Sequence, residues 1–464
     1  MSFPLDPAPQ DMQAMGEAAV SYLIAFIQGL DEAPAEATEG ALDLAHRLRA
    51  APPEHGGEFA PVFAEAQEAI SRTFEYAGPG YLAYIPGGGL YTAALADFIA
   101  QGVNRYVGLW QPSPAVVQIE ENVTRWLCDL FDYPEGSQGL LLSGGSMANL
   151  SAMVTARHAK LGEDFTDGVY YVSEQAHASV PKAATIAGFS KRNVRIVVTD
   201  DELRMDPEAL RTQIAHDRAD GLRPFLVAPS VGTTNTGAID PIADIADIAE
   251  AEDLWLHVDG AYGGFFQLTD RGRERFRGTE RSDSVTLDPH KGLFLPYGTG
   301  GLVVRDGAAM RDAHYEGAAY LQDLPPTGEL PNYSEHSAEL SRDWRGLRVW
   351  MPLALHGVSA FREALDEKLD LATYLADAFR DDDRIELCWE PQLTVIPFRL
   401  AGADDDTQRE FLARINASKR VFLSSTMIAG RYVLRVCIVS HRTHKDRIDE
   451  CIEIVGRAAD ELRA

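Results

Sequence analysis

A lysine stands at the end of a short apolar run, directly after a histidine and directly before a glycine. Lys291 follows Asp288, Pro289 and His290, and the preceding residues 284–287 carry the β-branched side chains typical of a strand. A lysine amine whose pKa is lowered by burial or by nearby cations is a nucleophile that forms Schiff bases with carbonyl compounds. A structural ion pair, or a surface position at a strand end, is the alternative use of such a lysine.

A carboxylate ends a second apolar run. Asp259 follows residues 254–258, and three glycines and an alanine lie among the next five positions. Ligands of open α/β sheets bind at the carboxyl ends of parallel strands, and small residues there leave room for a flat molecule. Asp259 could pair with a pyridinium nitrogen and keep that ring an electron sink. The commoner use of an aspartate after a strand is to cap a helix.

A third run leads into glycines and hydroxyls. Residues 140–142 are followed by Ser143, Gly144, Gly145 and Ser146, and a helical pattern begins there. Free backbone N–H groups at a helix start form an anion cradle suited to phosphate. The signal is weak by itself, and the segment is not a P-loop because it lacks the GxxxxGK[ST] lysine.

Two further strand ends carry polar side chains. His177 follows residues 170–173 and precedes a helical stretch, so its ring could stack on a planar cofactor, although a cap or core histidine is commoner. Thr234 follows another apolar run and could reach the same region.

The elements that must position these residues alternate in type. Between residues 81 and 310, short apolar runs alternate with helical stretches, which predicts a buried, mostly parallel sheet. Helical spacing over residues 11–75 predicts an N-terminal helical arm. The C-terminal part reads as helix, strands and a closing helix. We therefore expect an α/β fold with an arm and dimerisation segment (1–80), a large domain (81–346) that includes a mobile loop (320–341), and a small α+β domain (347–464).

Composition excludes several classes of partner. The chain has 464 residues, and 42 Lys+Arg against 70 Asp+Glu give a formal charge of −28, which argues against nucleic acid and anionic membranes. No apolar stretch is long enough to span a bilayer, and no signal peptide is evident. The four cysteines have no metal-ligand spacing, so we expect no metal, no disulfide framework and a reducing cytoplasmic location.

Together the motifs resemble a known family, the group II pyridoxal phosphate (PLP) decarboxylases of the aspartate aminotransferase fold type I. The resemblance covers residues 76–450 and includes aromatic L-amino acid decarboxylases. It is specific because several motifs match in order and spacing: SGGSMANL, SEQAH, GTTNTGAID, HVDGAYGG, DPHK, RGLRVW and YVLRVC. It implies a PLP-dependent carboxy-lyase that works as a homodimer with active sites at the subunit interface.

The resemblance also implies roles for individual residues. Lys291 corresponds to the lysine that forms the Schiff base with the cofactor, and Asp259 to the partner of the pyridine nitrogen. His177 corresponds to the residue that stacks on the ring, with Ala261 on the opposite face. Asp288 stands where aromatic decarboxylases often have asparagine, and a carboxylate beside phosphate needs a compensating partner. The cofactor-binding set implied is Gly145, Ser146, His177, Thr234, Asp259, Ala261, Ser284, Asp288, His290 and Lys291.

Other positions bear on the reaction and the substrate. Tyr333 corresponds to a mobile-loop tyrosine that protonates Cα after CO2 leaves, whereas phenylalanine at that place accompanies aldehyde formation. Tyr333 could also be a loop tyrosine without a role. Arg435 corresponds to an arginine near the substrate carboxylate, and a buried structural ion pair is its alternative. The segment 76–97 resembles the substrate side of aromatic decarboxylases, with Tyr76, Tyr84, Ile85 and Pro86 as pocket candidates.

The substrate class remains open at this level. The aromatic candidates favour tyrosine, DOPA or a tryptophan-like amino acid, although they are also ordinary core residues. Gly292 stands where aromatic members commonly have tryptophan, and Arg105 could meet an acidic side chain. The alternatives are an acidic amino acid such as glutamate or aspartate, and a PLP-dependent aldehyde synthase. A catalytically silent scaffold or a nicotinamide dehydrogenase fits less well, because the lysine, aspartate and histidine are all present and GxGxxG is absent.

Overall fold

The computed structural model describes residues 5–317 and 330–463 and has an α/β fold built on two sheets. The larger sheet has seven strands in the order β1-β7-β6-β5-β4-β2-β3, and only β7 runs against the others. Every residue of β5 and β6 is buried, as their near-continuous apolar sequences require. The strands are β1 (Gln138–Leu142), β2 (Gly168–Ser173), β3 (Val194–Val197), β4 (Arg223–Ala228), β5 (Trp255–Gly260), β6 (Ser284–Leu287) and β7 (Gly300–Val304).

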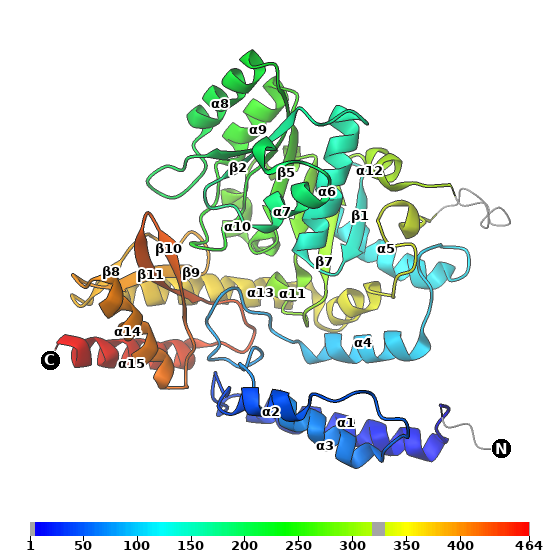
Figure 1. Cartoon of the computed structure of the whole chain (residues 1–464), viewed down its shortest axis with the longest axis vertical. Coiled ribbons are helices and arrows are strands. Elements are labelled where there is room, and N and C mark those ends of the chain that lie inside the picture. The colour runs from blue at the N-terminus through cyan, green and yellow to red at the C-terminus, as the bar shows by residue number, and fades with distance from the viewer. Residues whose placement is uncertain (1–4, 318–329, 464) are drawn as a thin grey trace.

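Helices cover both faces of this sheet, which makes a three-layer domain (Figure 1). Apolar residues of α5, α8 and α9 pack in the core on one face, and those of α6, α7 and α12 pack on the other. The predicted mostly parallel sheet is therefore confirmed. The helices are α4 (Tyr91–Val103), α5 (Pro114–Asp129), α6 (Gly145–Leu161), α7 (Ser179–Ile186), α8 (Pro207–Ala219), α9 (Ile242–Ala251), α10 (Asp270–Arg275), α11 (Pro289–Gly292) and α12 (Gly307–His314).

The C-terminal part forms a smaller α+β unit. Its sheet is antiparallel, in the order β10-β11-β9-β8, and α14 and α15 pack together beside it. The long helix α13 starts beside α4 and α5 and ends against β8, β9 and α15, so it joins the two units. The elements are α13 (Gly346–Arg380), β8 (Ile385–Leu387), β9 (Val395–Leu400), α14 (Asp405–Ala417), β10 (Ser424–Ile428), β11 (Arg431–Cys437) and α15 (Lys445–Arg463).

Three helices form the N-terminal arm: α1 (Pro9–Gly29), α2 (Ala41–Arg47) and α3 (Phe59–Ile70). Figure 1 shows them lying side by side beneath the rest of the molecule. Backbone hydrogen bonds tie the arm to the smaller unit, for example from Ala35 N–H to Lys419 O at 2.7 Å. The segment after the arm also joins that unit, because Leu82 N–H donates to Phe422 O and Leu82 O accepts from Cys437 N–H. Of the predicted mobile loop, residues 320–329 lie outside the described residues.

Candidate active site

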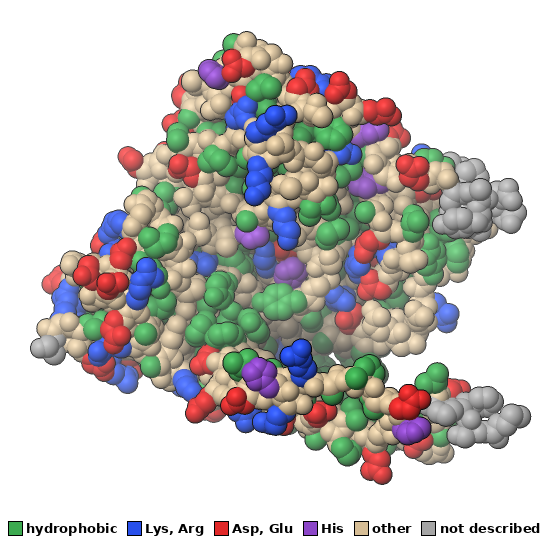
Figure 2. Space-filling view, viewed as in Figure 1, with side chains coloured by type: hydrophobic (Ala, Val, Ile, Leu, Met, Phe, Trp, Pro, Cys, Tyr) green, Lys and Arg blue, Asp and Glu red, His purple; other side chains and the backbone are tan. Residues whose placement is uncertain are grey.

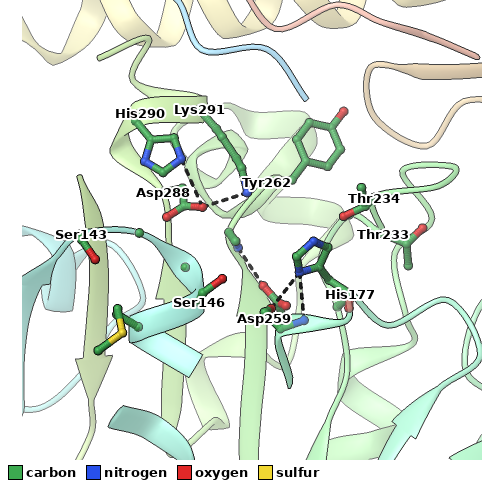
Figure 3. Close-up of a pocket in the computed structure, with 17 residues that line it drawn as sticks. Ser143, Ser146, His177, Thr233, Thr234, Asp259, Tyr262, Asp288, His290 and Lys291 are labelled. Atoms are coloured by element: carbon green, nitrogen blue, oxygen red, sulfur yellow. Dashed lines mark hydrogen bonds and ion pairs between the residues drawn. The ribbon is translucent and has the colours of Figure 1, made fainter. Parts of the chain in front are cut away.

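A cavity of about 270 Å³ opens at the carboxyl ends of β1, β2, β4, β5 and β6. Figure 2 shows histidine and basic side chains gathered in a hollow in the middle of one face, and Figure 3 shows the cavity from close by. Strands that run in the same direction bring their carboxyl ends to one edge of the sheet. Segments from residue 143 to residue 291 therefore meet around one space. The lining residues are Ser143, Gly144, Gly145, Ser146, Met147, His177, Ser179, Ser230, Gly232, Thr233, Thr234, Asp259, Ala261, Tyr262, Asp288, His290 and Lys291.

Lys291 points into this cavity from the short helix α11 (Figure 3). Its Nζ lies 2.8 Å from Asp288 Oδ2, and the Lys291 side chain is 21% exposed while that of Asp288 is 2% exposed. The amine is therefore reachable from the cavity and is held in place by one carboxylate. A lysine held in this way is positioned to condense with a carbonyl group.

His290 packs beside this pair. Its Nδ1 lies 2.6 Å from Thr299 O, and because a carbonyl only accepts, Nδ1 carries the proton. Its Nε2 lies 3.6 Å from Asp288 Oδ2. Burial lowers the pKa of His290, so the ring is neutral and presents Nε2 toward the cavity.

Asp259 lies near the end of β5 and is 6% exposed. Its Oδ1 accepts from Ala261 N–H at 3.1 Å and its Oδ2 accepts from Asn149 Nδ2 at 3.3 Å. Hydrogen-bond donors thus hold both carboxylate oxygens in place. A buried carboxylate of this kind can pair with a protonated ring nitrogen.

His177 lies beside Asp259, just before α7 (Figure 3). Its Nδ1 accepts from Ser179 N–H at 3.2 Å and lies 2.8 Å from Ser179 Oγ. A backbone N–H can only donate, so Nδ1 is unprotonated and the proton of the neutral ring lies on Nε2. Ser179 therefore fixes the orientation of a planar ring that borders the cavity.

The start of α6 forms the opposite wall. Gly145 and Ser146 open this helix, and the first N–H groups of a helix have no partner within it. A Cβ added at Gly145 would lie 3.0 Å from Ala261 Cβ and 3.0 Å from Asp288 Oδ2, so the glycine keeps this space open. Asp288 Oδ1 is buried and has no hydrogen-bond partner among the described residues. The start of α6 can bind a phosphate, Lys291 can condense with an aldehyde, and the buried carboxylate of Asp259 can pair with a ring nitrogen. Together these groups fit a phosphorylated pyridine aldehyde.

Ser284 is the one proposed cofactor contact that the structure places elsewhere. It starts β6, whereas Asp288 follows the other end of that strand, about 13 Å away at the usual rise per residue. Its hydroxyl lies 2.8 Å from Trp255 Nε1 and 2.8 Å from His257 Nδ1. The expectation that Ser284 belongs to the cofactor-binding set is therefore wrong; the other nine proposed residues all line the cavity.

Tyr333 also lies away from the cavity. It is fully buried in a 3-10 turn, with its hydroxyl 3.1 Å from Glu121 Oε2 and 3.4 Å from Thr124 Oγ1. The Arg342 guanidinium lies 4.7 Å from the centre of its ring. Burial raises the pKa values of both Tyr333 and Glu121. Packing against α5 holds the Tyr333 side chain inside in this structure, so its role as a mobile-loop proton donor stays a prediction.

The proposed substrate residues border the cavity without lining it. Ile85 and Pro86 are buried, with Ile85 in the main apolar core, and neither is among the residues that line the cavity. Tyr84 is 59% exposed and has the left-handed backbone φ of 52°. Its carbonyl accepts from Arg435 Nη2 at 2.9 Å, and the same Nη2 donates to the carbonyl of the lining residue Thr234 at 2.7 Å. Arg435 therefore lies directly behind the cavity wall.

Sequence reasoning missed several residues of this site. Ser179 lies two residues after His177, and Tyr262 lies three residues after Asp259 within the motif HVDGAYGG, so proximity along the chain could have found both. Asn149 lies one helical turn after Gly145, on the same side of α6, which is the spacing that brings side chains to one face. Its contact with Asp259 joins α6 to β5, and no local sequence pattern shows such a contact.

Comparison with known proteins identifies the family of this chain. The model of the pyridoxal-dependent decarboxylase conserved domain matches residues 42–401. The chain belongs to this family. It is 33% identical to an aromatic-L-amino-acid decarboxylase of Bacillus atrophaeus, over 100% of this chain and 98% of the other. It is 30% identical to an L-2,4-diaminobutyrate decarboxylase of Rhizobium meliloti, over 88% and 84%.

Solved structures agree with this assignment. The crystal structure of Oryza sativa TDC with PLP and tryptamine superposes with a TM-score of 0.94 at 26% identity, covering 100% of both chains. The predicted fold type is therefore confirmed, and so are the PLP cofactor and the class, a PLP-dependent amino acid decarboxylase. When bound, PLP supplies an aldehyde that condenses with an amine and a ring that accepts electrons from the bond being broken. Among the described residues of the decarboxylase there is no metal-binding cluster and no helix long and apolar enough to cross a membrane.

Proposed function

We propose that this decarboxylase acts on an aromatic L-amino acid, releasing CO2 and the corresponding amine. The observation that carries the proposal is a group of aromatic rings beside the cavity. The Tyr297 ring lies 5.5 Å from that of the lining residue His290, the Tyr76 ring lies 6.1 Å from Tyr297, and the Tyr81 ring lies 4.8 Å from Tyr76. Tyr297 is 54% exposed and Tyr76 is 41% exposed, so their ring surfaces are free to contact a ligand.

Arg435 supports recognition of a carboxylate. Its side chain is buried, its Nε has no hydrogen-bond partner, and within residues 5–317 and 330–463 no acidic side chain forms an ion pair with it. Burial lowers the pKa of Arg435 because the charged form is poorly solvated there. A buried cation without a counter-ion is costly, and an anion at the cavity wall would compensate it. We propose that the substrate carboxylate is that anion. It would lie on the cavity side of Thr234 and Tyr84, whose carbonyls accept hydrogen bonds from Arg435.

The other residues of the cavity would bind and orient the cofactor. Lys291 would hold PLP through its amine until the substrate amine takes its place. Asp259 would pair with the ring nitrogen, and His177 and Ala261 would hold the ring from its two faces. Such a grip would restrict the orientation of the bound substrate. In the overall reaction the substrate loses its carboxylate as CO2, and one proton takes the place of the carboxylate at Cα.

Tyr333 is our proposed source of that proton, although its hydroxyl does not reach the cavity in this structure. The proposal requires the segment around the 3-10 turn to leave α5 during turnover and break the hydrogen bond to Glu121. The family resemblance supports it. An aldehyde synthase is the competing function if this tyrosine plays no part.

An acidic substrate is the second candidate. The observation that favours it is the same Arg435, because a buried guanidinium could hold a side-chain carboxylate instead. The exposed rings of Tyr76 and Tyr297 favour the aromatic substrate, since a charged side chain gains little from them.

We further propose that the enzyme is a homodimer. None of the residues of α1 is buried within one chain, and Val20, Leu23 and Ile24 are 38%, 40% and 46% exposed. Apolar side chains repeated on one helix need a cover, and a second copy of the arm would supply it. The four cysteines are all unpaired, which fits the proposed reducing cytoplasm.

The test is incubation of the PLP-loaded enzyme with a panel of L-amino acids, with amine, aldehyde and CO2 measured together by mass spectrometry. The proposal expects equal amounts of amine and CO2 from tyrosine, DOPA or tryptophan and none from glutamate or aspartate. Turnover of an acidic member alone would replace the aromatic assignment. Aldehyde without amine from an aromatic member would identify a synthase.

A further inference from the structure

Behind Asp259, four buried side chains form a continuous line of hydrogen bonds away from the cavity. Trp255 Nε1 lies 2.8 Å from Ser284 Oγ, which lies 2.8 Å from His257 Nδ1. His257 Nε2 lies 3.0 Å from Asn149 Oδ1, and Asn149 Nδ2 lies 3.3 Å from Asp259 Oδ2. All five residues are at most 6% exposed. The line runs from the start of β5 to the start of β6, returns to β5 at His257, crosses to α6 and ends at Asp259 in β5.

The direction of every hydrogen bond in this line follows from its two ends. The indole N–H of Trp255 can only donate, so the Ser284 hydroxyl accepts it and donates its own proton to His257 Nδ1. At the other end, the Asp259 carboxylate can only accept, so the amide nitrogen of Asn149 faces it. Asn149 Oδ1 must then accept from His257 Nε2, which carries the proton of the ring. Ser284, His257 and Asn149 each accept one hydrogen bond and donate the next, so every bond in the line is donated in the direction of Asp259.

The line is consistent with a neutral His257. Burial lowers the pKa of His257 to about 4, and this effect outweighs the nearby Asp259, which raises it. A neutral ring has one donor and one acceptor, which is what the line requires of it. Thr286 Oγ1 donates to Asn149 Oδ1 at 2.6 Å and further fixes the amide orientation.

Asn149 also reaches the other proposed ring contact. Asn149 Nδ2 donates its second hydrogen to Ser179 Oγ, 2.8 Å from the nitrogen, and Ser179 orients His177. One amide group therefore connects the carboxylate below the cofactor site with the histidine that borders it.

We propose that the line Trp255–Ser284–His257–Asn149 is a positioning device that keeps Asp259 ionised and aimed at the ring nitrogen of the cofactor. The inference rests on the role proposed above for Asp259. Aligned hydrogen bonds polarise one another in a low-dielectric interior, so the remote donors strengthen the last bond to the carboxylate. An ionised Asp259 holds the ring nitrogen protonated, which the breaking of the Cα–carboxylate bond requires. None of the four residues touches the reacting atoms.

The test compares two cofactors in the apoenzyme: PLP, and 1-deaza-PLP, in which C–H replaces the ring nitrogen. Dissociation constants come from fluorescence quenching, so turnover is not needed. Ser284→Ala breaks the line at its second member, and we expect PLP binding to weaken about fivefold while 1-deaza-PLP binding changes less than about twofold. In the loaded enzyme, kcat should fall while KM stays unchanged.

The chain offers a matched control. Ser282 is fully buried like Ser284 and lies two residues away, but its hydroxyl donates to Thr279 O at 2.7 Å and contacts Tyr133 Oη at 2.6 Å, outside the line. Ser282→Ala should leave the ratio of the two dissociation constants unchanged. Trp255→Phe removes the first donor and keeps an aromatic ring, so it tests the same line if Ser284→Ala fails to fold.

The outcomes separate two failures. If Ser284→Ala and Trp255→Phe weaken both cofactors equally, or leave PLP binding unchanged, the line has only a structural role and the inference is overturned. Asp259→Ala serves as the reference and should abolish the preference for PLP over 1-deaza-PLP. If that preference survives in Asp259→Ala, the role of Asp259 itself is wrong, and the inference falls with it. The substrate panel described above is independent of both results.

Discussion

The cavity and the surroundings of Tyr333 are two polar regions of the same domain that differ in readiness for chemistry. Around the cavity, Lys291, Asp259 and His177 already face one space, and each is held by a fixed partner. Around Tyr333, the polar groups bind one another. Arg342 Nη2 lies 2.6 Å from Glu120 Oε1, both side chains are 0% exposed, and the tyrosine packs under the guanidinium.

The difference lies in which groups face a cavity. At the cavity, the Lys291 amine is reachable from solvent, and Asp288 Oδ1 has no hydrogen-bond donor among the described residues. In the region of Tyr333, the buried cation Arg342 is paired with the buried carboxylate Glu120, so this region stabilises the fold. A residue there takes part in turnover only if the pairing opens. Three substitutions test this contrast, from the largest expected effect to the smallest, and a fourth tests the hydrogen-bond line behind Asp259.

Replacing Lys291 by arginine should remove activity and keep the fold. Arginine keeps a cation beside Asp288, but its guanidinium does not lose its proton and cannot form the Schiff base. We expect the barrier to rise by about 4 kcal/mol or more, roughly a thousandfold in kcat. Product formation under saturating substrate measures it. Lys445→Arg on the exposed face of α15 is the control, and turnover near the wild-type rate in Lys291→Arg would contradict the assignment.

Replacing Arg342 by methionine should destabilise the fold. The substitution leaves Glu120 buried without its cation, and breaking such a pair costs about 3–5 kcal/mol of unfolding free energy. Urea denaturation measures the loss. The double variant Glu120→Gln/Arg342→Met should recover part of it, because no charge is then left unpaired. A loss below about 1 kcal/mol in the single variant would show that solvent reaches the pair.

Tyr333→Phe should shift product from amine toward aldehyde and ammonia, by a factor of about ten or less, because without the proton donor the electron pair left at Cα is open to oxidation by dissolved O2. Thr124→Val is the matched control, since it removes a hydrogen-bond partner of the phenol but keeps the phenol itself. The control should still yield amine. Unchanged amine output from Tyr333→Phe would leave Tyr333 with a packing role alone.

Stability should depend on His257 between pH 6.5 and 4. Burial lowers the pKa of His257 to about 4, so the unfolded chain binds a proton in this range before the native protein does. Native stability therefore falls as the pH falls, by at most about 1.4 kcal/mol per pH unit from this group. His257→Gln lacks this titration, so the gap in unfolding free energy between the wild type and the variant should narrow toward pH 4. If the unfolding free energies of the wild type and His257→Gln change in parallel with pH, the native His257 ring takes up its proton as readily as the ring in the unfolded chain.

The strand ends could be predicted from the sequence because the signals are local. Apolar runs followed at once by Asp259, His177 or Lys291 show both the strand and the functional residue at its end, and parallel strands bring those ends together. The anion cradle at Gly145 has the same local character. The cofactor contacts proposed from these patterns and from the family resemblance all line the cavity except Ser284, which came from the resemblance.

What failed depends on contacts between distant segments. Ser284 belongs to the strand that leads to Lys291, but it lies at the amino end of that strand, away from the cavity. Its hydroxyl hydrogen-bonds to His257 instead of the cofactor. The burial of Tyr333 is determined by α5, more than 200 residues earlier in the chain, as the 3.1 Å contact with Glu121 shows. Such pairings leave no periodic trace in either segment, so only the folded structure reveals them.

The most direct test of the central claim is to locate the cofactor on the chain. Borohydride reduction of the PLP-loaded enzyme fixes the cofactor to its lysine, and peptide mass mapping then identifies the modified residue. The account predicts that the pyridoxyl group lies on the peptide containing Lys291, with none on Lys182 or Lys368. A pyridoxyl group on any other lysine, with Lys291 unmodified, would contradict the assignment of this cavity as the active site.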